Sequence, residues 1–193
     1  MLKQVVAYHG GFIKIGETAW YASFDKEKPT LLKRGVKTDL GQILLTGRET
    51  DILIVAYDEL GIAIGMAWGR LVKTFTHVDR AFVLPAARGQ KIAERLIAYL
   101  LKTRVNILWN AVHDAMDHVA MKFGGKQGIV EGYRGWALTF ANAPKDKIDD
   151  LLIGVPIFQY CDKCKEKVPT GEYCSNCDQR LEPKIPIKRS IFS

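Results

Sequence analysis

The stretch from His77 to Lys102 constrains the fold of this chain more than any other part of the sequence. It opens with alternating residues of high β propensity and predicts a strand that ends before Pro85, because proline cannot donate to a β ladder. After a short turn, apolar residues recur at four-residue spacing in two rows and predict an amphipathic helix. The rows are Ile92, Leu96 and Leu100, and Ala93, Ile97 and Leu101. The other elements must therefore be arranged around a strand–turn–helix unit.

The turn inside this unit has the features of an anion-binding site. Arg88 and Gly89 lie directly before the helix. The first backbone N–H groups of a helix have no partner inside the helix, and the helix dipole is positive at that end. The alternative interpretation is an ordinary strand–turn–helix unit without a ligand, because short motifs of this kind are common.

The same residues resemble the acetyl-CoA signature of the GNAT N-acetyltransferases. That signature has an Arg or Gln, then Gly after two residues, then Gly or Ala after one more. Arg88 and Ala93 match, and Lys91 stands where the central Gly is usual. The resemblance implies an α/β (α+β) fold with a mixed, mostly antiparallel central sheet flanked by helices, and acetyl-CoA as cosubstrate. The usual Gly lets the backbone approach the pyrophosphate closely. Lys91 would either supply its N–H and its charge or block that approach.

The resemblance also implies which residues contact the cosubstrate. Two strands of the family splay apart and hold the pantetheine arm, and Phe82 and Val83 would offer backbone groups to it. The pyrophosphate would be held by Arg88, Gly89, Gln90, Lys91, Ile92 and Ala93. His113 falls near the position of an Asn that many relatives carry at the start of the next helix. Ala120 stands where many relatives carry a Tyr that protonates the leaving thiolate, so the usual general acid is missing.

Acyl transfer to an amine requires a base that removes a proton from the ammonium nucleophile. His77 and Asp79 are candidates, because alternation along the strand would place both on one face near the expected cleft. Tyr133 is a candidate for the missing acid. For each of these three residues, an ordinary solvated or packed role is the alternative.

Periodicity elsewhere predicts the order of elements of the GNAT core, and we expect an acyltransferase domain over residues 1–142. Strands are predicted at 3–8, 12–15, 18–24, 51–57, 62–68 and 106–112, followed by a closing hairpin at 128–133 and 136–140. Helices are predicted at 36–46 and 113–123. The second helix would end at Gly124 and Gly125, which favour a left-handed cap.

All four cysteines lie in two Cys-x-x-Cys pairs separated by nine residues. The pairs are Cys161 with Cys164 and Cys174 with Cys177. Four thiolates at this spacing favour a tetrahedral Zn²⁺ site, and rubredoxin-like iron is the alternative. With no open coordination position, the Zn²⁺ would be structural and would supply the folding energy of so small a module. The segment resembles a short zinc ribbon, predicted over 161–182, after a linker over 143–160 and before a flexible tail over 183–193.

Composition agrees with one main globular domain and a small addition. A chain of 193 residues that is 48% hydrophobic can bury a sizeable core. The net charge of +7 suits anionic ligands such as CoA or nucleic acid without requiring them. The sequence shows no signal peptide and no apolar run of membrane-spanning length, so we expect a cytoplasmic protein with no membrane contact.

The sequence therefore predicts an N-acetyltransferase that moves an acetyl or related acyl group from acyl-CoA to an amine by direct attack. The acceptor would be a small molecule, a protein or a nucleic acid. One alternative is a GNAT-fold binding protein without catalysis, whose zinc ribbon recognises a protein or a nucleic acid. Lys91 and Ala120 favour that alternative. Acyl transfer to a nucleobase is the other, and the basic charge agrees with it.

Overall fold

The computed structural model describes most of the chain. The described residues are 1–9, 20–24, 29–33, 42–45, 52–72, 75–104, 106–109, 114–130, 132–161, 163–171 and 173–181. The strands are β1 (Leu2–His9), β2 (Trp20–Phe24), β3 (Pro29–Lys33), β4 (Gln42–Leu45), β5 (Ile52–Asp58), β6 (Ala63–Val72), β7 (Phe75–Val83), β8 (Asn106–Trp109), β9 (Lys126–Val130), β10 (Tyr133–Thr139), β11 (Ile157–Cys161) and β12 (Glu166–Pro169). The α-helices are α1 (Ile92–Arg104), α2 (Asp114–Lys122) and α3 (Lys145–Leu152).

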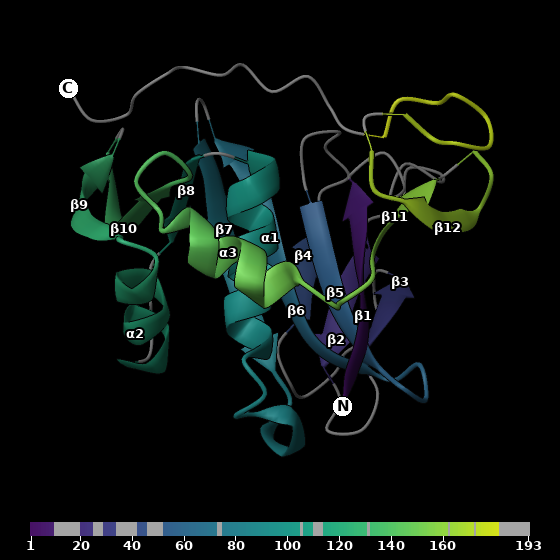
Figure 1. The fold of residues 1–193 in the computed structure, drawn as a ribbon, viewed down its shortest axis with the longest axis horizontal. Helices are drawn as coiled ribbons and strands as arrows, with labels where there is room; N and C mark the ends of the chain where they lie inside the picture. Colours follow the sequence, from purple (N-terminus) through teal and green to yellow (C-terminus); the bar gives the residue numbers. More distant parts are fainter. Residues whose placement is uncertain are drawn as a thin grey trace.

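The main layer of the molecule is a nine-stranded sheet in the order β12-β11-β1-β5-β6-β7-β8-β10-β9. Only the β1–β11 and β7–β8 pairs in this sheet are parallel among the described residues, and the others are antiparallel. A second sheet has three strands in the order β3-β2-β4. Figure 1 shows α1 and α3 crossing in front of the central strands. The predicted mixed, mostly antiparallel sheet flanked by helices is therefore confirmed.

The predicted strand–turn–helix unit is β7, a short turn and α1. Strands β5, β6 and β7 form an antiparallel meander. Parallel strands require a crossover connection, and α1 makes that connection between β7 and β8. The turn between β5 and β6 is held by Asp58, whose Oδ1 accepts hydrogen bonds from the backbone N–H groups of Leu60 and Ile62 at 2.9 and 2.8 Å.

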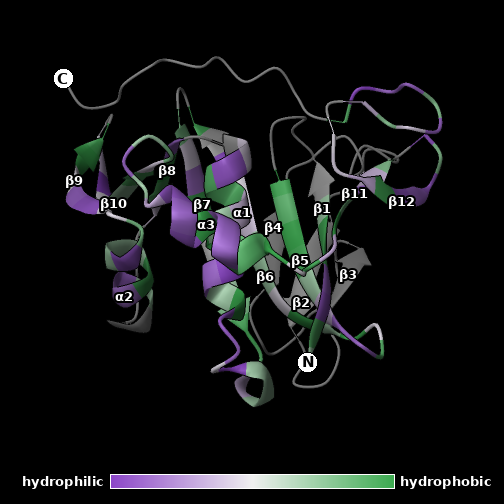
Figure 2. Cartoon of the chain, in the orientation of Figure 1, coloured by the Kyte–Doolittle hydropathy of each residue, from purple (hydrophilic) through white to green (hydrophobic). Residues whose placement is uncertain are grey.

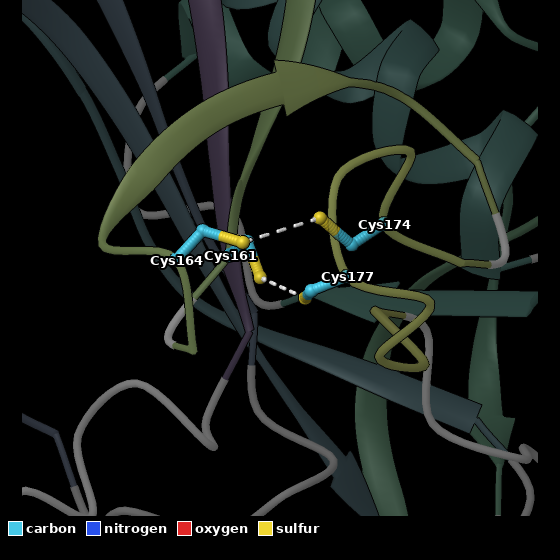
Figure 3. Close-up of side chains that lie close together, drawn as sticks. All are labelled: Cys161, Cys164, Cys174 and Cys177. Atoms are coloured by element: carbon cyan, nitrogen blue, oxygen red, sulfur yellow. Dashed lines mark hydrogen bonds between the residues drawn. The ribbon is translucent and has the colours of Figure 1, made fainter.

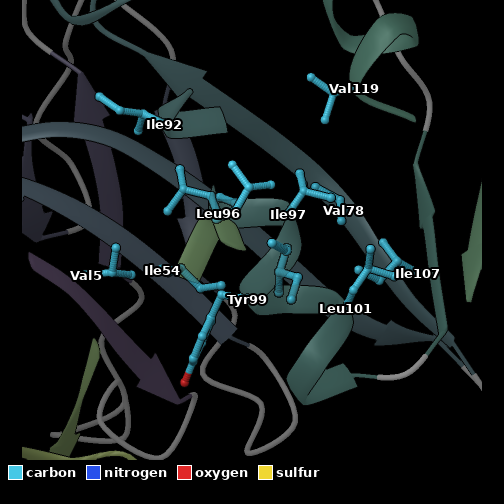
Figure 4. Close-up of a cluster of buried hydrophobic side chains, with 14 of the residues drawn as sticks. Val5, Ile54, Val78, Ile92, Leu96, Ile97, Tyr99, Leu101, Ile107 and Val119 are labelled. Carbon is cyan, nitrogen blue, oxygen red and sulfur yellow. The ribbon is translucent and has the colours of Figure 1, made fainter. Parts of the chain in front are cut away.

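The main core lies where α1 packs on the sheet. The two predicted apolar rows of α1 are buried apart from Ala93, which is partly buried, and they meet side chains from β1, β5, β7 and β8 (Figure 4). Complete burial of one such aliphatic side chain contributes about 1.5–3 kcal/mol. Figure 2 shows the same division, with hydrophobic residues along the central strands and hydrophilic residues gathered on α3. The amphipathic helix predicted from spacing alone is thus the element that closes the core.

The helix predicted at 36–46 is wrong where the structure describes it. Residues Gln42–Leu45 form β4, which pairs antiparallel with β2. Leu44 and Ile43 fit a helical spacing, but a β-branched, apolar segment of this length also suits a strand, and pairing with a neighbouring strand decides between the two. The predicted strand at 12–15 lies outside the described residues.

The segment expected to be a linker, 143–160, contains regular structure. Helix α3 packs against α1 and buries Ile148 and Leu151. Strand β11 then pairs in parallel with β1, with Val5 opposite Ile157 and Ala7 opposite Gln159. The physical reason is the apolar character of this stretch, because Leu151 is buried in the main core and Leu152, Val155 and Ile157 pack against it. The first cysteine is consequently the last residue of a strand of the main sheet.

Two further expectations concern the C-terminal residues and membrane-spanning helices. The predicted flexible tail, 183–193, lies outside the described residues. Within the part of the chain that is described, no helix combines the length and the apolar character needed to cross a membrane.

Two isoleucines at opposite surfaces of the α3 segment test its docking. Ile148 is 0% exposed, and Ile153, directly after the helix, is 71% exposed. We expect Ile148→Ala to lower the free energy of unfolding by about 2–5 kcal/mol, because it removes buried methyl groups and leaves a cavity. The matched control Ile153→Ala should change it by less than about 0.5 kcal/mol. Urea denaturation measures both. Equal, small effects would show that α3 is not part of the cooperative core.

Candidate functional site

Strands β7 and β8 are neighbours in the main sheet. They pair in parallel through Thr76 and Ile107, His77 and Leu108, and Val78 and Trp109. The described pairing ends at Val78 and Trp109, because residues 110–113 lie outside the described part of the structure, and β7 continues to Val83 and still pairs with β6 there. We call this arrangement the fork, with the Val78–Trp109 pair at its apex and residues 79–83 as the β7 arm. Phe82 and Val83, expected to meet a pantetheine arm, lie on the β7 arm.

The turn at the open end of the β7 arm has two left-handed residues. Gly89 has φ of +84° and Lys91 has φ of +57°, and α1 begins directly afterwards at Ile92. A left-handed backbone favours glycine, so Lys91 holds a conformation that suits the Gly found at this position of the resembled signature. Turns of this kind direct successive backbone N–H groups to one side and form anion-binding concavities. The backbone therefore keeps an anion-binding shape although the glycine is absent.

The side chains of the turn divide into exposed and anchoring groups. Arg88, Gly89, Gln90 and Lys91 are exposed, and Ala93 is partly buried. The Nε of Arg88 donates a hydrogen bond to the carbonyl oxygen of Val83 at 3.5 Å, across the turn. Ile92 is buried against Gly65 of β6, where an added Cβ would lie 2.9 Å from the Ile92 Cγ2. This contact fixes the start of α1, so the positive end of the helix is held beside the charged turn.

His77 lies at the apex of the fork, on the sheet face opposite α1. Val78 belongs to the main core that contains α1, whereas Phe75 belongs to a smaller cluster with Leu108. Strand alternation places His77 on the same face as Phe75. The ring of Tyr133, from β10, lies 5.6 Å from the His77 ring and 5.7 Å from the Phe75 ring. The structure thus brings together two residues that the sequence offered separately.

These two rings differ in their access to solvent. His77 is 9% exposed and Tyr133 is 38% exposed. Tyr133 is therefore the more accessible of the two side chains to an acceptor that arrives from solvent. A phenol and an imidazole in contact are suited to moving a proton in both directions.

A register shift separates His77 from the other candidate base. Trp68 pairs with Arg80, whereas the next residue, Gly69, pairs with Val78, so Asp79 is the extra residue of a β-bulge. The expectation that His77 and Asp79 lie on one face of the strand requires unbroken alternation of side chains along β7. The bulge interrupts that alternation. The Asp79 side chain and the whole of His113 lie outside the described part of the structure.

Helix α2 is tied to the sheet and to α1 by polar contacts. The indole Nε1 of Trp136 donates to Oδ1 of Asp117 at 2.6 Å, and Lys122 forms an ion pair with Glu94 in the first turn of α1 at 2.6 Å. Ala120, at the usual Tyr position of the family, is completely buried. Sequence reasoning did not identify the role of Asp117, because its partner is 19 residues away on another element.

The four cysteines converge on one point (Figure 3). Their Sγ atoms all lie within 4.8 Å of one another, with 3.7 Å between Cys161 and Cys177 and 3.8 Å between Cys164 and Cys174. Sulfur atoms about 2.3 Å from a tetrahedral Zn²⁺ are about 3.8 Å apart. The four cysteines could therefore hold a metal ion, and two of their Sγ–Sγ distances match those of a tetrahedral Zn²⁺ site.

The two cysteine pairs have the same local structure. The first cysteine of each pair, Cys161 and Cys174, is buried, and the second is partly exposed. The residue after each pair is left-handed, Lys165 with φ of +59° and Asp178 with φ of +56°. This repetition is expected when two equivalent turns hold opposite edges of one metal tetrahedron.

The thiol environments also differ within the cluster. Burial raises the pKa of Cys161. Burial alone would raise the pKa of Cys174 as well, but hydrogen bonds from the backbone of Asn176 and Cys177 and from the Cys161 side chain lower it to about 7. The backbone N–H of Asn176 lies 3.4 Å from the Cys174 Sγ. Such a donor stabilises the thiolate, which is the form that binds a metal.

Comparison with known proteins found one family model that matches part of the chain. Residues 31–112, a little under half of the chain, match the family model of the acetyltransferase (GNAT) domain. This match supports the prediction of an acetyltransferase-type enzyme domain over these residues. The matched residues include the whole of the fork and its turn. No curated protein matches the chain.

Several solved structures are similar to the chain at low sequence identity. A GNAT-family acetyltransferase from Staphylococcus aureus Mu50 has 15% identity and a TM-score of 0.42, covering 47% of this chain and 68% of its own. A nourseothricin acetyltransferase has 12% identity and a TM-score of 0.42, covering 72% and 88%. A phosphinothricin acetyltransferase from Sinorhizobium meliloti, in complex with acetyl-CoA, has 18% identity and a TM-score of 0.35, covering 45% and 57%.

The cysteine cluster makes a prediction about metal content and about the whole sheet. We expect the purified protein to contain one Zn²⁺ per chain and Cys174→Ser to lose it. Because Cys161 ends a strand that pairs with β1, loss of the metal should lower the melting temperature of the main domain and not only loosen the ribbon. Ser175→Ala, an exposed change within the same turn, is the control and should keep the metal. Elemental analysis that finds neither zinc nor iron in a protein prepared without chelator would contradict a metal centre.

Proposed function

We propose that this protein transfers an acyl group from acyl-CoA to an amine acceptor at the fork. The observation that carries the proposal is the left-handed turn at the positive end of α1, which follows the strand that pairs in parallel with β8. An opening between two strands accepts an extended chain, and the turn accepts an anion. Acyl-CoA combines these two features in one molecule, with a pantetheine arm attached to a pyrophosphate.

In this proposal the turn holds the pyrophosphate. The backbone N–H groups of residues 89–92 provide donors, and Arg88 and Lys91 add positive charge. The bond from Arg88 to Val83 keeps the guanidinium near the β7 arm, where the phosphate end of the ligand would enter. Phe82 and Val83 then lie where the pantetheine arm passes.

The acyl thioester supplies the electrophilic carbonyl, and His77 and Tyr133 accept and donate the protons. The amine nitrogen forms a bond to the carbonyl carbon while the carbon–sulfur bond breaks. His77 accepts the proton that the amine loses, and the departing thiolate takes a proton from Tyr133. The proton on His77 then returns to Tyr133 through water, which restores both groups.

Tyr133 would thus replace the family Tyr whose position is occupied by Ala120. Ala120 is buried and has no proton to give, so the acid must come from another element. The hairpin of β9 and β10 supplies Tyr133 from the face opposite α1. The Zn²⁺ centre, in the same proposal, is structural and stabilises β11 and β12 at the far edge of the sheet.

A binding protein without catalysis is the second candidate. It is favoured by Lys91, whose Cβ stands in the anion-binding turn where glycine is usual. The two candidates differ in turnover and not in fold. The acceptor of the first candidate is an amine of a small molecule, a protein or a nucleic acid, nucleobase amines included.

Binding of the cosubstrate is tested at the turn. Titration calorimetry should show acetyl-CoA binding to the parent protein and binding at least about tenfold weaker to Arg88→Glu, because the variant places a like charge beside the phosphates. Lys147→Glu makes the same charge change on the exposed face of α3 and should leave the affinity unchanged. Lys91→Gly should preserve or improve binding. It should also raise the melting temperature slightly, since a left-handed lysine is strained. Absence of binding in all four proteins, with folding intact, would remove the acyltransferase proposal.

Proton transfer is tested at the apex. His77→Gln and Tyr133→Phe should each lower kcat by about 10²-fold and change the KM for acetyl-CoA little, because both groups act on protons and not on cosubstrate binding. Tyr133→Phe keeps the ring that packs on Phe75, so its fold should be intact. Full activity in both variants would place the base and the acid elsewhere.

A further inference from the structure

A buried hydrogen-bond donor at the apex of the fork lacks an acceptor. Trp109, the last residue of β8, is 2% exposed, and its indole Nε1 has no hydrogen-bond partner among the described residues. Leaving such a donor buried and unsatisfied costs about 1–3 kcal/mol. Buried polar groups are usually satisfied, so an orphaned one marks a place where a ligand or water is expected.

This donor lies at the apex, which is the last described pair of β7 and β8. Trp109 forms the last described pair with Val78 on β7, and on its other side it pairs with Trp136 of β10. Its side chain belongs to the main core together with Val78. The donor therefore lies on the α1 side of the sheet, whereas His77 lies on the opposite side of the same apex.

The length of the β7 arm connects this donor to the turn. Five residues separate Val78 from Val83, a span of about 17 Å at about 3.3 Å per residue. An extended pantetheine arm covers a distance of this order. If the pyrophosphate lies at residues 88–92, the acyl end of the ligand reaches the apex. This step rests on the proposed function.

We propose that the Trp109 indole N–H donates a hydrogen bond to the carbonyl oxygen of the acyl thioester. The bond holds the carbonyl at the apex, with Trp109 on one face of the sheet and His77 on the other. It also stabilises the negative charge that develops on the carbonyl oxygen during attack. The hydrogen bond to the oxygen offsets the cost of the orphaned donor. Because free CoA has no such oxygen, Trp109 favours the substrate over the product of the reaction.

A second tryptophan provides a matched control. Trp68 on β6 is 7% exposed, and its Nε1 also lacks a partner among the described residues. It is opposite Arg80 and not at the apex, and it lies outside the main core that contains Trp109. The two side chains thus share their chemistry and burial and differ in their place relative to the fork.

The experiment compares Trp109→Phe with Trp68→Phe by calorimetry with acetyl-CoA and with CoA. Phenylalanine keeps an aromatic ring and removes the N–H. We expect Trp109→Phe to bind acetyl-CoA about five- to tenfold more weakly and CoA with unchanged affinity, because one hydrogen bond is lost only with the acylated ligand. Trp68→Phe should bind both ligands like the parent.

A measurement on the parent protein guards against a variant that does not fold. The four tryptophans give four indole N–H signals in a ¹⁵N–¹H spectrum, which are assigned by single Trp→Phe changes. Acetyl-CoA should shift the Trp109 signal in the manner of a new hydrogen bond, and CoA should not. If Trp109→Phe fails to fold, its signal is assigned by elimination from the other three variants.

Several results would overturn the assignment. They are an equal loss of affinity for both ligands in Trp109→Phe, no loss at all, the same loss in Trp68→Phe, or a Trp109 signal that CoA and acetyl-CoA shift alike. In each of these cases the parent still binds acetyl-CoA, so the proposed function stands and only the role of Trp109 fails. A parent that binds neither ligand would remove both.

Discussion

The short parallel pairing of β7 with β8 is the constraint on which the candidate site depends. Parallel strands cannot be joined by a hairpin, so α1 must cross the sheet, and its apolar stripe holds it there. The crossover places the start of α1 beside the end of β7. The described pairing ends at the apex while β7 continues, and the proposed opening for the pantetheine arm lies there. The anion-binding turn and the opening are thus consequences of one connection.

Both faces of the sheet contribute to the apex. His77 and Tyr133 meet on the face opposite α1, and Trp109 lies on the α1 face. A carbonyl group placed at the apex would have a proton acceptor on one side and a hydrogen-bond donor on the other. The bulge at Asp79 begins the β7 arm directly beyond this point and changes which residues of the arm face each side. The chemistry of the site therefore follows from where the alternation along β7 stops.

Much of this arrangement could be predicted from the sequence, and the reasons are local. The two apolar rows of α1, the meander of β5 and β6, and the convergence of the four cysteines all follow from periodicity or ligand spacing. The β4 segment could not be assigned in this way, because Ile43 and Leu44 suit either a helix or a strand until β2 is beside them. The contact of Tyr133 with His77 and the bond of Trp136 to Asp117 join residues far apart in sequence. The register of the sheet decides those contacts, and no short motif encodes it.

The pairing of β1 with β11 has a consequence for how the chain reaches this structure. Val5 lies opposite Ile157, so β1 can complete this edge of the sheet only after β11, which follows much later in the sequence, has been synthesised. Contacts between such distant residues slow folding, because a long loop must be closed before the pairing contributes any stability. During synthesis, β1 can pair with β5 on one side while its other edge stays exposed. An exposed strand edge is a site for pairing with other chains. The segment with the four cysteines directly follows β11. It is therefore synthesised at the stage when pairing of β11 with β1 can cover the exposed edge of the sheet.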